Sequence, residues 1–153
     1  MNPRSFTLVI AFAISLPLAS CDEAPTDGPP AVRLAHDLCA ECNMIISDQR
    51  WATATIVEGP RGPEPRIFDD FNCQVRYEHT NPNLAIISRW SNDHATLEWI
   101  HTESAIFLSA ESIMSPMGSG MAAFANESLA VTPLHTETSK TLTFTEAWQT
   151  LRP

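Results

Sequence analysis

Trp51-Ala-Thr-Ala-Thr-Ile-Val57 has the β-branched residues and the rough alternation that are typical of a strand. The segment after it, Glu58-Gly-Pro-Arg-Gly-Pro-Glu-Pro65, is so rich in glycine and proline that it predicts a loop. Arg66-Ile-Phe68 then resumes as a short partner strand. Together these residues predict a β-hairpin.

A helix is expected directly after this hairpin. Phe68-Asp69-Asp70-Phe71 places two carboxylates at its start, where aspartate can cap free amides and negative charge suits the helix N-terminus. The helix should run to about Glu78, with Cys73 and Tyr77 four residues apart on one face. It should end before Pro82, because the residue preceding a proline is pushed out of the helical region.

The rest of the chain repeats this succession in outline. Further strands are predicted over residues 84–90, 96–101, 122–125 and 141–144, and helices over residues 126–132 and 145–148. Between them lies Met114-Ser-Pro-Met-Gly-Ser-Gly-Met121, which reads as a glycine-rich loop with three methionines. A strand pair, a helix and a strand therefore occur twice, which predicts an α+β fold on a mainly antiparallel sheet.

The N-terminus has the pattern of a bacterial lipoprotein. Residues 1–20 combine Arg4 with a short apolar run, as in a signal peptide, and Leu18-Ala-Ser-Cys21 resembles a lipobox. Cys21 would then carry the lipid and anchor the chain to a membrane. Residues 21–31, with several prolines, read as this lipidated cysteine and a flexible linker, which leaves residues 32–153 as the folded domain.

The charge balance excludes one class of partner. The chain has 9 basic and 18 acidic residues, so that removal of Arg4 with the signal peptide leaves 8 against 18, a net charge of −10. Without a basic patch, nucleic acid is not expected as a partner. The sequence also shows no Ser-His-Asp or paired-carboxylate constellation, so we expect a binding protein and not an enzyme.

Cys39-Ala-Glu-Cys-Asn-Met44 is a dense cluster of sulfur donors. Three chemistries remain open from the residues: a structural zinc site, a thiol–disulfide pair and a Cu(I) site. A c-type haem is excluded because Asn43 stands where a histidine would be needed. Zinc is disfavoured by the shortage of a fourth ligand, and a redox pair by the lack of a long helix after the motif.

Cu(I) accounts for more of the residues, because thioethers join thiolates in binding this soft ion. Met44 follows the second cysteine, and Met117 lies between Pro116 and Gly118, where core packing needs it least. Met114 and Met121 are as well explained by packing as by ligation. Cys73 is expected to be buried and inert, and His94 and His101 are left outside the ligand set.

These blocks resemble the NosL family of copper-binding lipoproteins. The resemblance rests on Cys39-x-x-Cys42-x-Met44, Phe68-Asp69-Asp70 with Cys73, Trp99-Ile100, and Ser115-Pro-Met-Gly-Ser-Gly-Met-Ala-Ala-Phe124. It implies two related ββαβ subdomains, similar to part of organomercurial lyase. It also implies Cu(I) ligands at the matching positions, Cys39, Cys42, Met44 and Met117.

The resemblance further implies a role and a place. Such a protein would stand on the periplasmic face of a bacterial membrane, inner or outer. It would deliver copper to the machinery that builds the copper–sulfide centre of nitrous oxide reductase. Its partners would be an ABC-type transporter with its periplasmic component and, directly or indirectly, the reductase.

One position departs from the family pattern, because Asn43 stands where glycine is usual. Asparagine tolerates a left-handed backbone, so the turn should survive. The alternative function is a membrane-anchored thiol–disulfide protein.

Overall fold

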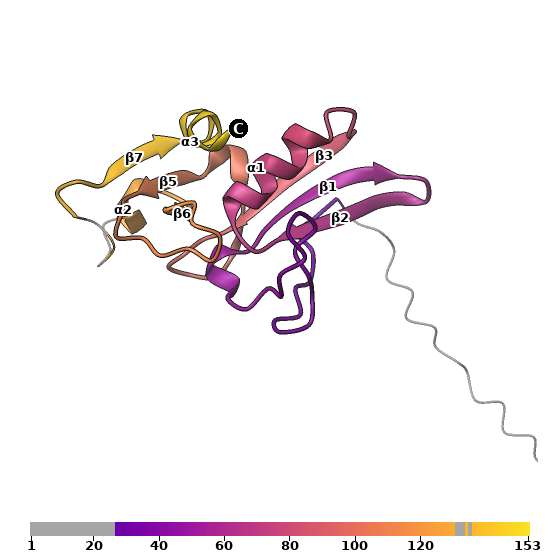
Figure 1. The fold of residues 1–153 in the computed structure, drawn as a ribbon, viewed down its shortest axis with the longest axis horizontal. Helices are drawn as coiled ribbons and strands as arrows, with labels where there is room; N and C mark the ends of the chain where they lie inside the picture. The colour runs from indigo at the N-terminus through magenta and orange to yellow at the C-terminus, as the bar shows by residue number, and fades with distance from the viewer. Residues whose placement is uncertain (1–26, 131–133, 135) are drawn as a thin grey trace, which may run out of the picture.

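The first half of the chain forms a four-stranded antiparallel sheet (Figure 1). The computed structural model describes residues 27–130, 134 and 136–153. The elements of this half are η1 (Gln49–Trp51), β1 (Thr53–Gly59), β2 (Gly62–Phe68), α1 (Phe71–Thr80), β3 (Ile86–Asn92) and β4 (Trp99–His101). The strand order is β2-β1-β3-β4, and every neighbouring pair is antiparallel.

The predicted hairpin is confirmed, but its strands are longer than the sequence indicated. The β1–β2 pairing runs from Thr53 opposite Phe68 to Gly59 opposite Gly62. Pro63 and Pro65 therefore lie within β2 and not in a loop. Prolines are tolerated here because β2 is an edge strand, whose outward amide positions need no ladder partner.

A second, smaller sheet follows the same plan. Its elements are η2 (Thr102–Ser104), β5 (Ile106–Ser109), β6 (Met121–Phe124), α2 (Glu127–Ala130), β7 (Lys140–Thr143) and α3 (Phe144–Leu151). The order β6-β5-β7 matches β2-β1-β3, with the first strand of each unit in the centre and both neighbours antiparallel to it. The expected α+β fold of two ββαβ units is confirmed.

Helix α1 packs against the second unit as well as its own. Phe71 stacks on Phe107 of β5 with ring centroids 4.4 Å apart, and Trp148 of α3 meets Phe71 edge-on at 5.9 Å. These residues belong to a buried apolar cluster shared by the two units; its fully buried members are Phe71, Val75, Ala105, Phe107, Met121, Ala123 and Ala147. The helix is therefore placed by both sheets at once.

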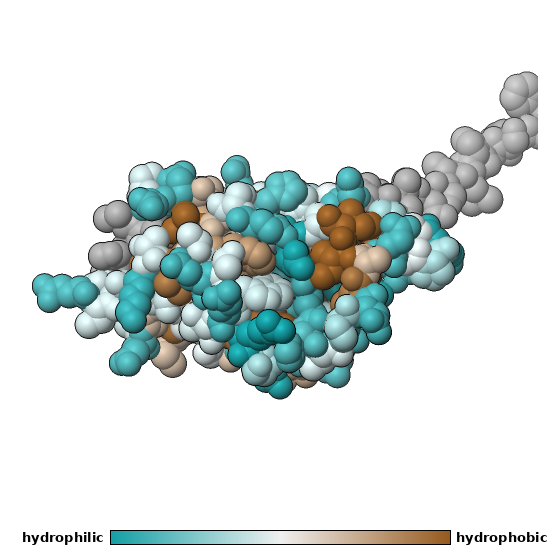
Figure 2. All heavy atoms as spheres, turned by 90° about the horizontal axis from the view of Figure 1, so that it is seen from above, coloured by the Kyte–Doolittle hydropathy of each residue, from teal (hydrophilic) through white to brown (hydrophobic). Residues whose placement is uncertain are grey.

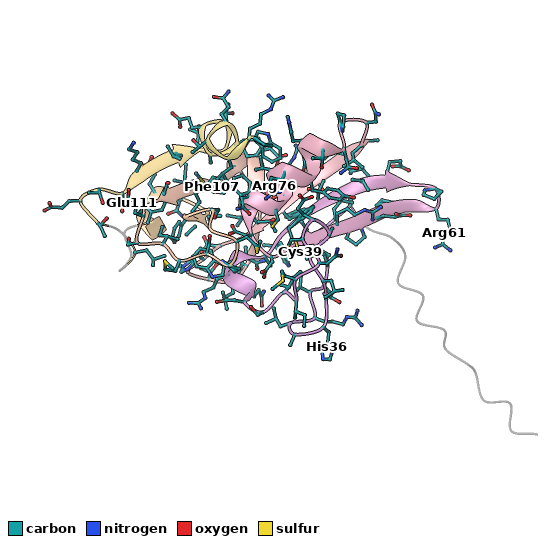
Figure 3. The ribbon with its side chains drawn as sticks, in the orientation of Figure 1. His36, Cys39, Arg61, Arg76, Phe107 and Glu111 are labelled. Atoms are coloured by element: carbon teal, nitrogen blue, oxygen red, sulfur yellow. The ribbon has the colours of Figure 1, made fainter. Side chains whose placement is uncertain are left out.

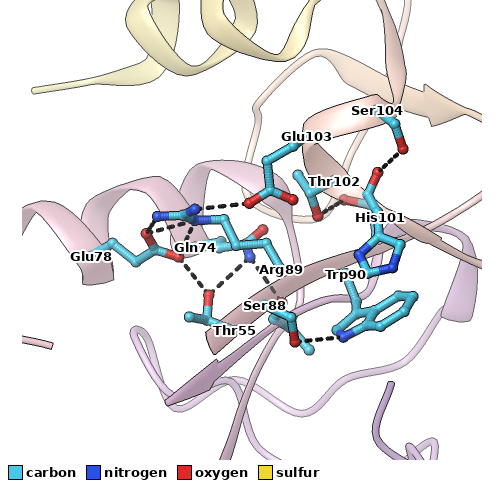
Figure 4. Close-up of polar contacts among 12 residues, drawn as sticks. Thr55, Gln74, Glu78, Ser88, Arg89, Trp90, His101, Thr102, Glu103 and Ser104 are labelled. Carbon is cyan, nitrogen blue, oxygen red and sulfur yellow. Dashed lines mark hydrogen bonds and ion pairs between the residues drawn. The ribbon is translucent and has the colours of Figure 1, made fainter. Parts of the chain in front are cut away.

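Beside this apolar contact, a buried polar network holds α1 to the first sheet (Figure 4). Gln74 donates to the carbonyl of Ala54 at 3.0 Å and to Thr55 Oγ1 at 2.9 Å. Thr55 Oγ1 in turn donates to Glu78 at 2.6 Å, and Arg89 of β3 forms an ion pair with Glu78 at 2.8 Å. These contacts fix the rotation of the helix about its axis.

Some expected boundaries differ from the observed ones. The chain after Met44 does not enter a strand; it forms one isolated bridge between Leu38 and Ile45, then the η1 turn. Residues 1–26, with the predicted signal peptide and Cys21, lie outside the described residues, as do residues 131–133, where helix 126–132 was expected to end. Asp27, within the predicted linker, accepts a hydrogen bond from Ser88 on its backbone carbonyl at 2.7 Å.

The described surface is mostly polar. Figure 2 shows one face on which hydrophilic residues predominate and hydrophobic side chains gather in small areas. Among the residues that the structure describes, none of the helices has the length and apolar character needed to cross a membrane.

Candidate metal centre

The first two cysteines lie in a tight loop that precedes the first sheet. The amide of Cys39 donates to the carbonyl of Met44 at 2.8 Å, and the amide of Asn43 donates to the carbonyl of Cys39 at 2.9 Å. Closing this turn requires a left-handed residue, and Asn43 has a φ of 59°. The expectation that asparagine can replace the family's glycine at this turn is confirmed.

Backbone pairing holds this loop against the hairpin. The amide of Ala40 donates to the carbonyl of Ile67 in β2 at 2.8 Å. Cys39 then packs with Phe68 at the end of β2 and with Cys73 of α1 in a small buried cluster. Figure 3 shows Cys39 where the loop meets the helix and the hairpin. The site is thus built where three parts of the first unit converge.

Three thiols meet at this point. The Sγ atoms of Cys39, Cys42 and Cys73 all lie within 4.8 Å of one another, and Cys42 and Cys73 are 4.0 Å apart. Cys39 and Cys73 are buried, and Cys42 is half-buried. The predicted burial of Cys73 is confirmed. The first turn of α1 also brings its thiol to the other two, which makes Cys73 a candidate ligand that was predicted to be inert.

The protein environment favours one negative charge in this cluster. A hydrogen bond from Cys73, helped by backbone amides, outweighs burial and lowers the pKa of Cys39 to about 5. Donating that hydrogen bond, together with burial, raises the pKa of Cys73. Burial also raises the pKa of Cys42. At neutral pH the metal-free cluster therefore holds one thiolate at Cys39 and two protonated thiols.

One carboxylate beside the cluster responds to the same surroundings. Asp69 is buried, and burial together with the charge of Cys39 raises its pKa to about 6. Its Oδ1 atom has no hydrogen-bond partner. A positive ion bound at Cys39 would offset both effects, since a nearby cation favours the charged form of a carboxylate.

The methionines have different surroundings. Met117 packs against the cluster of Cys39, Phe68 and Cys73. Met44 is 56% exposed beside the loop, and Met114 is 85% exposed. Met121 is a core residue of β6, so its side chain serves packing. The structure therefore brings Met117 to the buried cluster that contains two of the thiols, while ligation by Met117 and by Met44 stays a prediction.

The histidines that the sequence analysis set aside also have structural roles. His94 meets Trp51 edge-on, with ring centroids 4.8 Å apart, and His101 stacks on Trp90 at 3.9 Å. In the part of the chain that the structure describes, the group of potential metal ligands among histidine, cysteine and carboxylate side chains consists of the three cysteines alone.

This donor set suits a soft metal ion. Thiolates and thioethers select ions such as Cu(I), whereas a structural zinc site is usually completed by four protein ligands. Fold and site together define an α+β protein of two ββαβ units with a largely buried cluster of three thiols that could hold a metal ion.

A comparison with protein-family models matches NosL over residues 31–151, so the chain belongs to the NosL family. The match and the three-cysteine cluster together suggest copper binding. No curated protein and no solved structure matches the chain.

Sequence reasoning missed two contributions to the site. Cys73 was recognised on the helix face that carries Tyr77, yet nothing local indicated that this face would turn toward the loop. Asp70 was expected to cap α1, but its side chain makes no capping hydrogen bond. Its Oδ2 atom instead accepts hydrogen bonds from the loop that carries Met117. That role depends on a contact between residues 47 positions apart and has no local signal.

Proposed function

We propose that this protein is a periplasmic Cu(I) metallochaperone that supplies copper for assembly of the copper–sulfide centre of nitrous oxide reductase. The observation that carries the proposal is the meeting of three thiols within 4.8 Å in a chain of the NosL family. The role is that of a carrier and not of an enzyme.

The arrangement of the donors supports binding that can be reversed by exchange. Cys39 and Cys73 are buried, whereas Cys42 is half-buried and Met44 is exposed. An incoming ligand would therefore meet Met44 and Cys42 first, and would displace them before the buried thiols. Stepwise exchange moves Cu(I) between proteins without releasing the free ion.

The cellular setting of the proposal follows from the family and from the N-terminal sequence. A lipid on Cys21 would hold the domain at the periplasmic face of a membrane. An ABC-type transporter and its periplasmic component would be its partners, with nitrous oxide reductase as the final recipient. Mass spectrometry of the membrane fraction tests the anchor, and an unmodified, soluble form that begins elsewhere would contradict it.

Titration of the reduced, metal-free protein with Cu(I) against a competing chelator tests the metal site. We expect one tightly bound Cu(I) per chain, severe weakening in Cys39→Ser and Cys73→Ser, and clear weakening in Met117→Ala. Met114→Ala is the matched control, because it removes an exposed thioether from the same loop. Failure of the cysteine variants to weaken binding would refute this site.

A thiol–disulfide protein is the second candidate, favoured by the 4.0 Å separation of the Cys42 and Cys73 sulfurs and by the low pKa of Cys39. It predicts rapid exchange of the reduced protein with a disulfide-containing peptide, in which a thiolate of the protein attacks the disulfide and releases a peptide thiol. It also predicts copper binding that is indifferent to Met44→Ala and Met117→Ala. The chaperone predicts the opposite pattern for both measurements.

A further inference from the structure

The loop that carries Met117 is attached to the first turn of α1. Asp70 is almost completely buried, and its Oδ2 atom accepts three hydrogen bonds from this loop. The donors are Ser115 Oγ at 2.7 Å, the amide of Met117 at 2.9 Å and the amide of Ser119 at 3.2 Å. One carboxylate oxygen thus gathers the turn from residue 115 to residue 119.

A side chain in the first turn of α1 binds the carbonyl group of the same residue, Met117. Asn72 Nδ2 donates to the carbonyl of Met117 at 2.7 Å. Both backbone polar groups of Met117 are therefore bound at the N-terminal end of α1, its amide by the N-cap residue Asp70 and its carbonyl by Asn72. The residue after Asn72 is Cys73, whose thiol belongs to the metal centre.

In this arrangement the side chain of Asp70 does not cap the helix. An aspartate at this position usually caps the helix through its side chain, which stabilises the helix. Here the side chain makes no capping hydrogen bond and binds the loop instead. Its geometry is explained by holding the loop and not by holding the helix.

We propose that Asp70 and Asn72 are positioning residues that set the Met117 thioether against the three thiols. Both act through Met117, and neither touches the metal. Because α1 is itself fixed by both sheets, the thiol of Cys73 and the backbone of Met117 are held by a single rigid element. The inference rests on the proposed copper-binding function.

A double-mutant cycle on the full chain tests this coupling. Asn72→Ala should weaken Cu(I) binding about fivefold, the effect of losing one well-formed hydrogen bond. In a Met117→Ala background the same change should alter affinity by less than about twofold, because the residue that it positions is gone. Thr143→Ala, which removes a hydrogen bond at the start of α3, is the control and should leave affinity unchanged.

Two further measurements test the same coupling between α1 and Met117 by other means. Ser115→Ala removes one loop donor to Asp70, together with the contacts of the Ser115 hydroxyl to Ser119 and Gly120, and leaves the buried carboxylate in place. It should weaken binding at least as much as Asn72→Ala. In protein labelled at the methionine methyls, the Met117 resonance should shift on adding Cu(I) in the wild type and shift less in Asn72→Ala. The exposed Met114 supplies an internal reference.

The outcomes separate the two claims. If Asn72→Ala has the same effect with and without Met117, or no effect, the positioning role is refuted and the chaperone stands. If Met117→Ala leaves affinity unchanged while Cys39→Ser abolishes binding, the positioning role is again refuted and copper binding stands. Absence of Cu(I) binding to the wild type overturns the proposed function itself.

Discussion

Replacing Arg89 with alanine tests how firmly α1 is held. Arg89 makes hydrogen bonds to both carboxylate oxygens of Glu78, with its Nε atom at 3.0 and 2.9 Å and its Nη2 atom at 2.8 Å. The Glu78 side chain is only 4% exposed. The substitution therefore leaves a buried carboxylate with Thr55 as its one remaining hydrogen-bond partner shown in Figure 4.

The geometry sets the size of the effect. Removing one member of a buried ion pair costs about 3–5 kcal/mol. The surviving hydrogen bond from Thr55 and the 23% exposure of the Arg89 side chain place this case near the lower limit. Arg89 also lies over the Trp148 ring at 5.3 Å, a contact of about 0.5–1 kcal/mol. We expect a loss of about 3 kcal/mol, a large share of the ~5–15 kcal/mol typical of a domain.

Urea unfolding of the reduced, metal-free protein measures this loss. Glu103→Gln is the matched control, because Glu103 pairs with the same arginine at 2.8 Å but is 42% exposed, and exposed pairs contribute about 0–1 kcal/mol. Combining Glu78→Gln with Arg89→Met removes both charges and should recover most of the stability. A loss in Arg89→Ala no larger than that in Glu103→Gln would refute the buried-pair argument.

Three further predictions concern the site and the helix ends. The ultraviolet absorbance of the Cys39 thiolate should titrate with a midpoint near pH 5 and should be lost in Cys39→Ser, whereas a first midpoint near pH 9 would contradict the assigned charge. Because the pKa of Cys39 is lowered from 9.0 by folding, its thiolate should make the free energy of unfolding rise with pH between about 5 and 9. Asn43→Val should lower stability by about 1–2 kcal/mol because of the left-handed backbone, while Asn43→Gly should not, as thermal unfolding would show; equal losses would exclude this cause. Thr143→Ala should cost about 1 kcal/mol in urea unfolding, since Thr143 and Glu146 form a capping box at α3, and an unchanged midpoint would mean that the cap contributes nothing.

Local patterns predicted most of the fold because they determine local structure. The alternation from Trp51 to Val57 and the carboxylates before Phe71 located the hairpin and α1 within a few residues. The extension of β2 through Pro63 and Pro65 was missed, because whether a proline is tolerated depends on whether its strand lies at a sheet edge. That is a property of the assembled sheet and not of the segment.

The residues of the candidate site were likewise predicted only where a local pattern determines them. Cys39 and Cys42 were found because they share one motif, and the left-handed turn at Asn43 follows from residue preference alone. Cys73 and Asp70 acquire their roles only when α1 packs against the loops around it, with its rotation set by Gln74 and Phe71. Sequence spacing places Cys73 on the helix face that carries Tyr77, but it does not say what that face contacts.

A centre assembled from separate segments links metal content to the lifetime of the protein. Cys42 and Cys73 are 31 positions apart, and nothing holds their thiols together in an unfolded chain. The three-thiol cluster therefore forms only when the chain folds. An ion that binds only the folded form stabilises it by mass action, by about 4.1 kcal/mol when its free concentration is a thousand times the dissociation constant. Empty chains would then open, and be cleaved by proteases, far more often than loaded ones. Degradation would remove chains that hold no metal, and the surviving population would be enriched in the metal-bound form.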